Sequence, residues 1–337
     1  MKLITLPCNP SDYGGYGRAV RDDLARLKIG NNDVIVIYDR KESSDDSRYE
    51  YIPRHPAISL HGIMNIARGR VWAELSKDSL RKIVNRYNIE EVFVGDTILY
   101  RAVKELFPAV KMTVRFHNLY LLPWVRVRTR KINIDLAART LLELASRLEL
   151  QILNDELANH IFISDNDANM AKLLFPNISY KVWTIEKIVA GVEPTPPGCQ
   201  RLVYSGSLAA HQKCGVVEFI RGPYRKLRKR HPKTRLEIYG RRGRELESVG
   251  DNIKWCGDWK DTPVPKLDGG GLFVNPDILG AGIKYKIGDW IASGTPFIST
   301  PYGIQGYRIT ESPHRLIAPL DKWDTEIEKY WVKWNVG

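Results

Sequence analysis

The 337-residue sequence has few cysteines and no long hydrophobic run. Its four cysteines, Cys8, Cys199, Cys214 and Cys256, are far apart and form no Cys-x-x-Cys pair, which argues against a disulfide framework and a zinc site. No stretch approaches the roughly 18 apolar residues of a membrane span, and the first residues lack the apolar core of a secretory signal. We therefore expect a cytoplasmic protein with reduced thiols.

Acidic residues are outnumbered by basic ones, 39 to 51, and the formal net charge is +12. A positive field of this size favours anionic partners, such as nucleotide phosphates, membrane headgroups or nucleic acid, without choosing among them. Residues 221–244 hold eleven lysines or arginines and one acid, Glu237. A second basic stretch supplies a candidate acceptor or anionic surface formed by Arg126, Arg128, Arg130 and Lys131.

Short apolar runs alternate with helical patterns along the chain, which predicts βαβ units and parallel sheets buried on both faces. In the first half, strands are expected at 2–6, 34–38, 91–94, 111–116 and 160–163, and a long helix at 135–159. In the second half, strands are expected at 202–205, 236–239, 253–256, 272–275, 296–300 and 316–318, and helices at 216–229 and 284–293. The predicted fold is α/β, with two doubly wound, Rossmann-like domains and a ligand cleft between them.

The pattern breaks near residue 190 in a run rich in proline and glycine, which favours an irregular connector. This places an N-terminal acceptor-side domain at 1–190, a linker at 191–200, a second domain at 201–320 and a C-terminal helix at 321–337. One stripe of that helix is aromatic and apolar, comprising Trp323, Ile327, Tyr330, Trp331 and Trp334. We expect the stripe to dock on the body of the protein, with interfacial membrane binding as the alternative.

Glycines follow the first strand, at Gly14, Gly15 and Gly17. They let backbone N–H groups approach a phosphate or sugar at a helix N-terminus. The spacing is not that of the dinucleotide fingerprint, so a structural turn and a ligand loop both stay open on the residues alone. His117, at the end of a later strand, also has two interpretations on the residues alone. It is either a structural residue that forms hydrogen bonds or a residue of a ligand-binding site.

Two segments of the second half form a stronger constellation. Residues 203–208 run off a strand toward Lys213, just before the predicted helix, where an ammonium can meet a diphosphate facing the helix dipole. Residues 275–296 form a glycine-rich strand end that opens a helix. Asp289 lies about a turn and a half inside that helix, where a carboxylate can accept hydrogen bonds from ribose hydroxyls.

The second segment resembles the donor-site signature of glycosyltransferase family 4, which ends in Glu-Ala-Met-Ala-x-Gly-x-Pro. Residues 289–296 match it in register, with Asp289 in place of the glutamate that holds the nucleotide ribose. Other family features follow in order, namely the Gly14–Gly17 loop, the linker at 190–193, the loop from Gly206 to Gly215, and Tyr239-Gly240. The resemblance spans about residues 13 to 306 and implies the GT-B fold.

By resemblance, the protein is a retaining, metal-independent glycosyltransferase that uses a UDP- or GDP-linked sugar as donor substrate and has no tightly bound cofactor. His117, facing the donor sugar, and Lys213 would be catalytic. The implied donor-binding residues are Gly14, Gly15, Gly17, Ser207, His211, Gly240, Gly280, Ala281, Gly282, Lys284, Lys286 and Asp289. The Asp-x-Asp at 165–167 follows a strand and precedes a helix, so we interpret it as a helix cap and expect no metal.

Two departures from the family pattern concern charge. Ala281 stands where the family has the first glutamate of its Glu-x7-Glu pair, and Ser207 stands where an arginine is expected, with one extra residue before Lys213. His211, Lys284 and Lys286 are candidates to replace the lost cation.

The acceptor is expected to be a cell-envelope polysaccharide or a lipid-linked glycan at an anionic membrane surface. A modified base in DNA is the alternative that fits the same charge. Two rivals keep the fold and change the function. One is a nucleotide-sugar epimerase, and the other is a degenerate GT-B domain that binds nucleic acid or another partner.

Overall fold

The computed structural model describes the chain except for residues 11–14, 40–48, 55–58, 72–73, 133, 185–193, 195, 207, 209, 259–263, 266, 268–269, 308, 310–311 and 337. The chain divides into two compact units. The first comprises Met1–Val125 and Arg139–Ile185, and the second comprises Arg126–Ala138 and Glu186–Gly337. Residues 126–138 thus group with the second unit by their contacts, whereas the sequence-based boundary keeps them in 1–190.

A seven-stranded parallel sheet forms the centre of the first unit, with the strand order β3-β2-β1-β4-β5-β6-β7. Its strands are β1 (Lys2–Leu6), β2 (Val34–Asp39), β3 (Tyr49–Pro53), β4 (Glu91–Val94), β5 (Met112–Phe116), β6 (Ala158–Phe162) and β7 (Tyr180–Val182). Its helices are α1 (Gly15–Arg26), α2 (Leu60–Ala67), α3 (Lys77–Val84), α4 (Thr97–Leu106), α5 (Leu121–Arg130), α6 (Leu136–Leu153) and α7 (Asp165–Leu174). The order reverses between β1 and β4, as in doubly wound folds.

Successive residues of the central strand β1 pack in two hydrophobic clusters, one on each face of the sheet. Leu3 packs in the cluster that contains the buried faces of α3, α4 and α6, whereas Ile4 packs in the cluster with Val20 of α1. Side chains alternate between the two faces of a strand, so the continuous apolar runs in the sequence correspond to a sheet covered on both sides.

The expected helix at 135–159 is wrong in its last turn. Helix α6 ends at Leu153, and β6 has begun by Ala158. A turn at Asp155 separates the two, because its side chain accepts from Leu157 N at 3.0 Å and its carbonyl accepts from Ala158 N at 3.0 Å.

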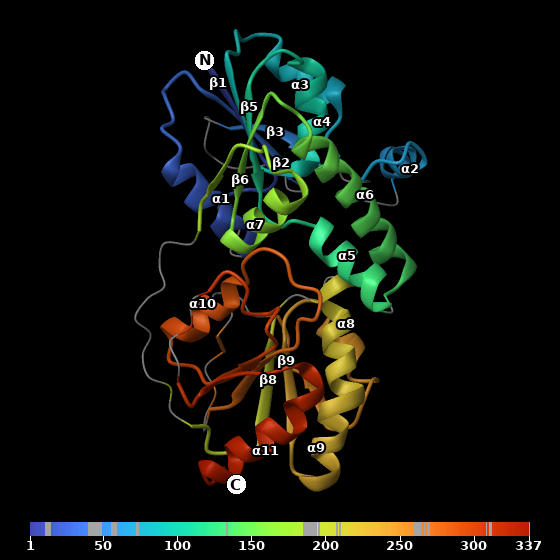
Figure 1. The fold of residues 1–337 in the computed structure, drawn as a ribbon, viewed down its shortest axis with the longest axis vertical. Coiled ribbons are helices and arrows are strands. Elements are labelled where there is room, and N and C mark those ends of the chain that lie inside the picture. The colour runs from blue at the N-terminus through green and yellow to red at the C-terminus, as the bar shows by residue number, and fades with distance from the viewer. Residues whose placement is uncertain are drawn as a thin grey trace. The chain divides into compact units, whose positions relative to one another are not determined.

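The second unit repeats the architecture with six parallel strands in the order β10-β9-β8-β11-β12-β13. Its strands are β8 (Arg201–Ser205), β9 (Arg235–Tyr239), β10 (Ile253–Trp255), β11 (Leu272–Asn275), β12 (Phe297–Ser299) and β13 (Arg315–Ile317). Its helices are α8 (Ala210–Phe219), α9 (Arg225–Arg230), α10 (Tyr285–Ala292) and α11 (Trp323–Lys333), and short turns lie at η2 (Gly243–Leu246) and η3 (Leu320–Lys322). Figure 1 shows α10 on one side of this sheet and α8 and α9 on the other.

Helices α8 and α9 are joined by the π-helical turn η1 (Ile220–Tyr224), which contains Pro223. A proline has no N–H to donate, and the wider π turn accommodates it inside the helix. The joined helix begins at Ala210, six residues before the expected start at 216. Lys213 therefore lies inside the first turns of α8 and not in a loop before the helix.

The C-terminal helix α11 packs in the core of the second unit. Trp323, Ile327, Tyr330 and Trp331 are buried there, and Trp334 is partly buried. The Trp323 ring lies edge-on to Phe219 at 5.4 Å, and its Nε1 donates to Ala318 O at 2.9 Å. Burial of the Trp323 and Trp331 side chains makes this helix part of the unit's main hydrophobic core.

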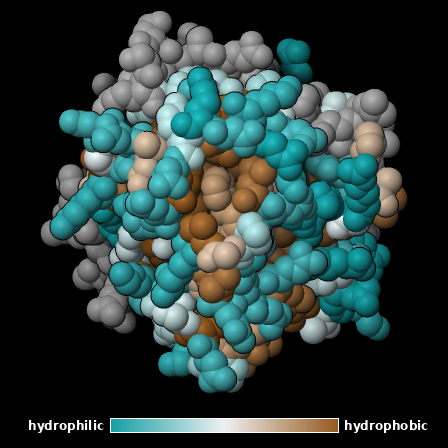
Figure 2. All heavy atoms as spheres, turned by 90° about the horizontal axis from the view of Figure 1, so that it is seen from above, coloured by the Kyte–Doolittle hydropathy of each residue, from teal (hydrophilic) through white to brown (hydrophobic). Residues whose placement is uncertain are grey.

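The face drawn in Figure 2 is predominantly hydrophilic, and hydrophobic residues show at its centre. Scattered apolar side chains are common on soluble protein surfaces. None of the helices among the described residues is long and apolar enough to cross a membrane.

Candidate functional site

The glycine-rich segments of the second unit meet at one edge of its sheet. Strands β8 and β11 are neighbours at the point where the strand order reverses, and ligands bind beyond the carboxyl ends of such strands. Gly206 follows β8 with φ 153°, and Gly240 follows β9 with φ 132°. A Cβ atom on Gly240 would lie 2.2 Å from Gly206 O. The absence of side chains at these positions therefore lets the two strand ends approach closely.

The loop after β11 is shaped by Asp277, whose side chain accepts from Leu279 N at 3.2 Å and from Gly280 N at 3.1 Å. Gly280 has φ 32° and Gly282 has φ 61°, so the loop turns through the left-handed region twice. Ala281, between them, is 7% exposed. The expected glycines thus belong to one tight loop held by a buried carboxylate.

Two lysines of the predicted donor site follow this loop in different settings. Lys284 caps the start of α10, and its Nζ lies 3.4 Å from Asp277 Oδ2 and 2.5 Å from Ala281 O. Lys286 directs its Nζ over the Tyr204 ring at 4.5 Å and over the Trp290 ring at 5.6 Å. Burial lowers the pKa of Lys286 to about 7; the Asp277 carboxylate opposes this shift and the Lys284 ammonium adds to it.

Helix α8 approaches the same loop through Gly215. A Cβ atom there would lie 1.8 Å from Pro276 O. Lys213, one turn earlier, pairs with Glu245 Oε2 at 2.5 Å, and its side chain is 34% exposed. The predicted diphosphate ligand Lys213 therefore already has a carboxylate neighbour, which the sequence reading did not foresee.

Asp289 is the fifth residue of α10 and is half-buried. The next residue, Trp290, is fully buried against Phe273 and Phe297, so α10 is anchored on the sheet beside Asp289. Ser207 lies outside the described residues, and nothing is described of the His211 side chain beyond its place in α8. Neither replacement of the lost cation by His211 nor a role for Ser207 is tested.

In the first unit, His117 follows β5 and is 5% exposed. Its Nε2 lies 3.4 Å from Asp23 Oδ2 of α1, and the same carboxylate lies 3.0 Å from Arg115 Nε. Burial and the Arg115 charge lower the pKa of His117 to about 3, so its imidazole is neutral at physiological pH. Burial raises the pKa of Asp23 to about 6, against the attraction of Arg115.

Arg115 ties this cluster to the backbone. Its guanidinium donates to Phe162 O at 3.0 Å and to Trp183 O at 3.1 Å. The arrangement joins α1 to β5 and β6 and fixes His117 among charged neighbours. Asp23 was not predicted as a neighbour of His117, because Asp23 and Arg115 are 92 residues apart in the sequence.

The glycine turn of the first unit is partly outside the described residues, since Gly14 falls in 11–14. Gly15 is the first residue of α1, and Gly17 is buried in its first turn. A second glycine is critical at this edge, because a Cβ on Gly95 after β4 would lie 2.4 Å from Thr5 O of β1.

The basic stretch at the end of α5 is not uniformly open to solvent. Arg126 donates to the carbonyl oxygens of Leu279 and Gly280, and its guanidinium lies 4.2 Å above the Tyr302 ring. These contacts are within the second unit. The other three residues, Arg128, Arg130 and Lys131, are exposed. Arg126 therefore supports the loop after β11, and the predicted anionic surface consists of the three exposed residues only.

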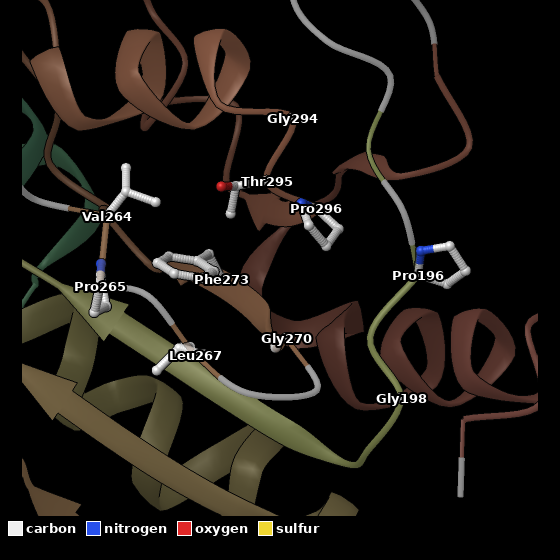
Figure 3. Close-up of a pocket in the computed structure, with 11 residues that line it drawn as sticks. Pro196, Gly198, Val264, Pro265, Leu267, Gly270, Phe273, Gly294, Thr295 and Pro296 are labelled. Atoms are coloured by element: carbon white, nitrogen blue, oxygen red, sulfur yellow. The ribbon is translucent and has the colours of Figure 1, made fainter.

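A cavity of about 410 Å³ lies at the opposite edge of the same sheet, before β8, β11 and β12. Figure 3 shows Pro196 and Pro296 on one side of it and Val264, Pro265 and Leu267 on the other. Its lining contains no charged side chain. A nucleoside diphosphate needs cations or clustered N–H groups, so this cavity does not fit one. Among the described residues, no group of three or more side chains suited to a metal is present.

Part of the chain, within the second unit, matches a known protein family. Residues 199–327 match the family model described as glycosyl transferases group 1. No curated protein matches the chain. The chain has the GT-B fold. The residues matched by the family model include β8, the glycine loops and α10, which together form the candidate site.

Solved structures are similar to this chain over nearly its whole length. Sucrose-phosphate synthase from Thermosynechococcus elongatus is 14% identical, with a TM-score of 0.64 over 99% of this chain and 90% of the other. The α,α-trehalose 6-phosphate synthase of Burkholderia multivorans is 11% identical, with a TM-score of 0.58 over 98% and 88%. Anabaena Alr3699/HepE, solved in complex with UDP and glucose, is 10% identical, with a TM-score of 0.56 over 98% and 89%. These likenesses confirm the predicted fold.

Proposed function

We propose that the protein transfers a sugar from a nucleoside-diphosphate sugar, bound at the carboxyl edge of the second unit's sheet, to an acceptor hydroxyl. The observation that carries this proposal is the convergence at one strand-order reversal of close glycine loops, the starts of α8 and α10, and three lysines. Such an edge suits a diphosphate, because N–H groups, helix dipoles and ammonium groups all favour negative charge. The complexes of Anabaena Alr3699/HepE with UDP support a UDP-linked donor, and a GDP-linked donor is the alternative.

The proposed roles follow from these positions. The backbone of Gly280–Gly282 and the Lys213 ammonium bind the diphosphate, and Asp289 accepts from the ribose hydroxyls. Gly240 has no side chain, so the loops after β8 and β9 meet without a side chain standing in the site. Because Lys213 pairs with Glu245, donor binding requires this lysine to be shared or to leave its partner.

The chemistry we propose is electrostatic. The cations stabilise the charge that develops on the departing diphosphate, while the protein holds the acceptor hydroxyl near the anomeric carbon. Retention of configuration and independence of metal rest on the family resemblance. His117 is assigned to the sugar and acceptor side as a neutral imidazole, in keeping with its lowered pKa; Gly15 and Gly17 are assigned to the same side.

The acceptor we propose is a cell-envelope polysaccharide or a lipid-linked glycan, reached at an anionic membrane surface. Exposed cations support an anionic partner, namely Arg128, Arg130 and Lys131 at the end of α5, and Arg221, Arg225, Lys226 and Lys229 along η1 and α9. A modified base in DNA fits the same charge, and binding that falls steeply with salt and follows nucleic acid would favour it.

The donor is tested by thermal unfolding in the presence of a panel of UDP- and GDP-linked sugars. A donor should stabilise the wild type and should stabilise Lys213→Ala and Asp289→Ala much less, by mass action. Lys329→Ala removes an exposed lysine of α11 and is the matched control, which should respond like the wild type. The same small stabilisation of all four proteins by every sugar would contradict the proposed donor site.

Product analysis separates the enzymatic rivals. A transferase releases nucleoside diphosphate only when an acceptor is supplied, whereas an epimerase converts the nucleotide sugar alone. Binding of a partner with no turnover, unaffected by Asp289→Ala, is the result expected of a degenerate binding domain. Release of nucleotide on addition of a glycan acceptor is the result that supports the proposal.

A further inference from the structure

The Lys286 ammonium is exceptional among the lysines of the candidate site. Lys213 has Glu245 within 2.5 Å, and Lys284 has Asp277 within 3.4 Å. Lys286 forms no hydrogen bond or ion pair with the part of the chain that the structure describes, and it faces only the rings of Tyr204 and Trp290. A cation over aromatic faces is stabilised less than it is by full hydration.

Neighbouring groups leave this amine poorly stabilised as a cation. Its pKa is lowered to about 7, mainly by burial. Asp277, on the loop after β11, attracts the charge, but Lys284 at the start of α10 repels it. Tyr204 on β8 faces the amine with a phenol whose pKa burial raises above its usual value, so that phenol stays neutral. An anion placed beside Lys286 would supply the missing stabilisation.

The amine also stands where the site needs a cation. A Cβ atom on Gly206 would lie 3.5 Å from Lys286 Nζ. The residue after Gly206, where the family resemblance leads one to expect an arginine, is Ser207. Lys286 therefore brings a positive charge from α10 to the loop after β8, the same edge of the sheet that the arginine would occupy.

We propose that Lys286 is the second diphosphate-binding cation of this glycosyltransferase, and that donor binding above neutral pH proceeds with uptake of one proton by its amine. The inference rests on the proposed function, since it assigns the donor of that same site. The enzyme then holds a neutral amine among aromatic rings until the diphosphate arrives, and it binds donor more weakly as the solution becomes more alkaline.

The test is calorimetric titration of the full chain with UDP-glucose and GDP-glucose from about pH 6 to 8.5. Over this range the diphosphate of a nucleotide sugar stays fully ionised and its base stays mostly uncharged, so a change of affinity reports the protein. The wild-type Kd should be constant below pH 7 and should then rise by about tenfold per pH unit. Repeating the titration in two buffers of different ionisation enthalpy should show uptake approaching one proton per donor at pH 8.

Three variants isolate the amine. Lys286→Arg carries a charge that persists across the range, so it should bind donor with a flat pH profile. Lys286→Met should bind at least about a hundredfold more weakly at pH 6, also with a flat profile. Lys329→Met, which removes an exposed lysine of α11, should keep the wild-type profile.

The possible failures are distinguishable. Tight donor binding by the wild type with no pH dependence, or a wild-type profile in Lys286→Met, overturns the role of Lys286 and leaves the proposed donor site standing. No binding of either nucleotide sugar at any pH contradicts the proposed function and the inference together.

Discussion

A single methyl group at Gly215 should disturb the contact between α8 and the donor loop. A Cβ there would lie 1.8 Å from Pro276 O and 2.9 Å from Pro276 C, both backbone atoms that cannot rotate away. Overpacking costs about 1–3 kcal/mol, and contact with backbone favours the upper end of this range. The conformational gain of alanine over glycine in a helix, about 0.5–1 kcal/mol, offsets only part. Gly215→Ala should therefore lower the free energy of unfolding of the second unit by about 2 kcal/mol.

The π-helical turn η1, which follows α8, offers a matched control at Gly222. A Cβ atom there would meet nothing within 4 Å. Gly222→Ala makes the same chemical change without the collision, so it should stabilise the second unit by up to about 1 kcal/mol or leave it unchanged. The two alanine variants should thus move the stability in different directions.

Urea denaturation followed by tryptophan fluorescence measures the difference. Six of the nine tryptophans lie in the second unit, at Trp255, Trp259, Trp290, Trp323, Trp331 and Trp334. The midpoint should fall for Gly215→Ala with an unchanged denaturant slope, and it should not fall for Gly222→Ala. Donor affinity should also fall in Gly215→Ala, because α8 and the loop after β11 are pushed apart. Equal midpoints for the two variants would refute the close packing described here.

Three further substitutions test other parts of the account. Arg115→Met leaves the buried Asp23 carboxylate without its cation and should lower the free energy of unfolding of the first unit by about 3–5 kcal/mol at pH 8. The pKa of Asp23 is already raised to about 6 and rises further without the cation, so this loss should shrink toward pH 5 as the carboxyl is protonated in the folded state; a loss of equal size at both pH values would contradict it. Ser164→Ala removes the side chain that accepts from Asp167 N at 3.1 Å at the start of α7, and urea titration should show a loss of about 1 kcal/mol. Trp323→Ala should cost about 3–5 kcal/mol of core packing, whereas Lys329→Ala on the exposed side of α11 should change stability by less than about 0.5 kcal/mol; similar thermal midpoints for these two variants would contradict the docked helix.

The sequence predicted the central strands best, because burial on both faces leaves continuous apolar runs. The positions of β1, β4 and β11 agree with the expected ranges to the residue. Two edge strands were not predicted, β3 and β7. In β3 only one of five residues is buried, and β7 has three residues with none buried, so neither carries the apolar pattern of a central strand.

The site was predictable to the extent that it depends on glycine. Gly240, Gly280 and Gly282 adopt backbone conformations with positive φ, and glycine is the residue that such positions favour, so the glycines in the sequence indicate them. The partners of the charged groups were not predictable, because they come from elements far apart in the chain. Asp277, the partner of Lys284, lies nearby in the sequence, on the loop that leads to Lys284. Tyr204, the partner of Lys286, lies on β8, far from Lys286 in the sequence.

The most direct test of the donor site is amide hydrogen exchange of the full chain with and without a saturating nucleotide sugar, starting with UDP-glucose. We predict that bound donor slows the exchange of backbone amides in the segments that follow β8, β9 and β11, namely 205–215, 239–241 and 276–289. Amides of α9 and α11, on the far side of the second unit's core, should exchange at unchanged rates. Protection confined to segments outside these loops would contradict the assignment of the donor to this edge of the sheet.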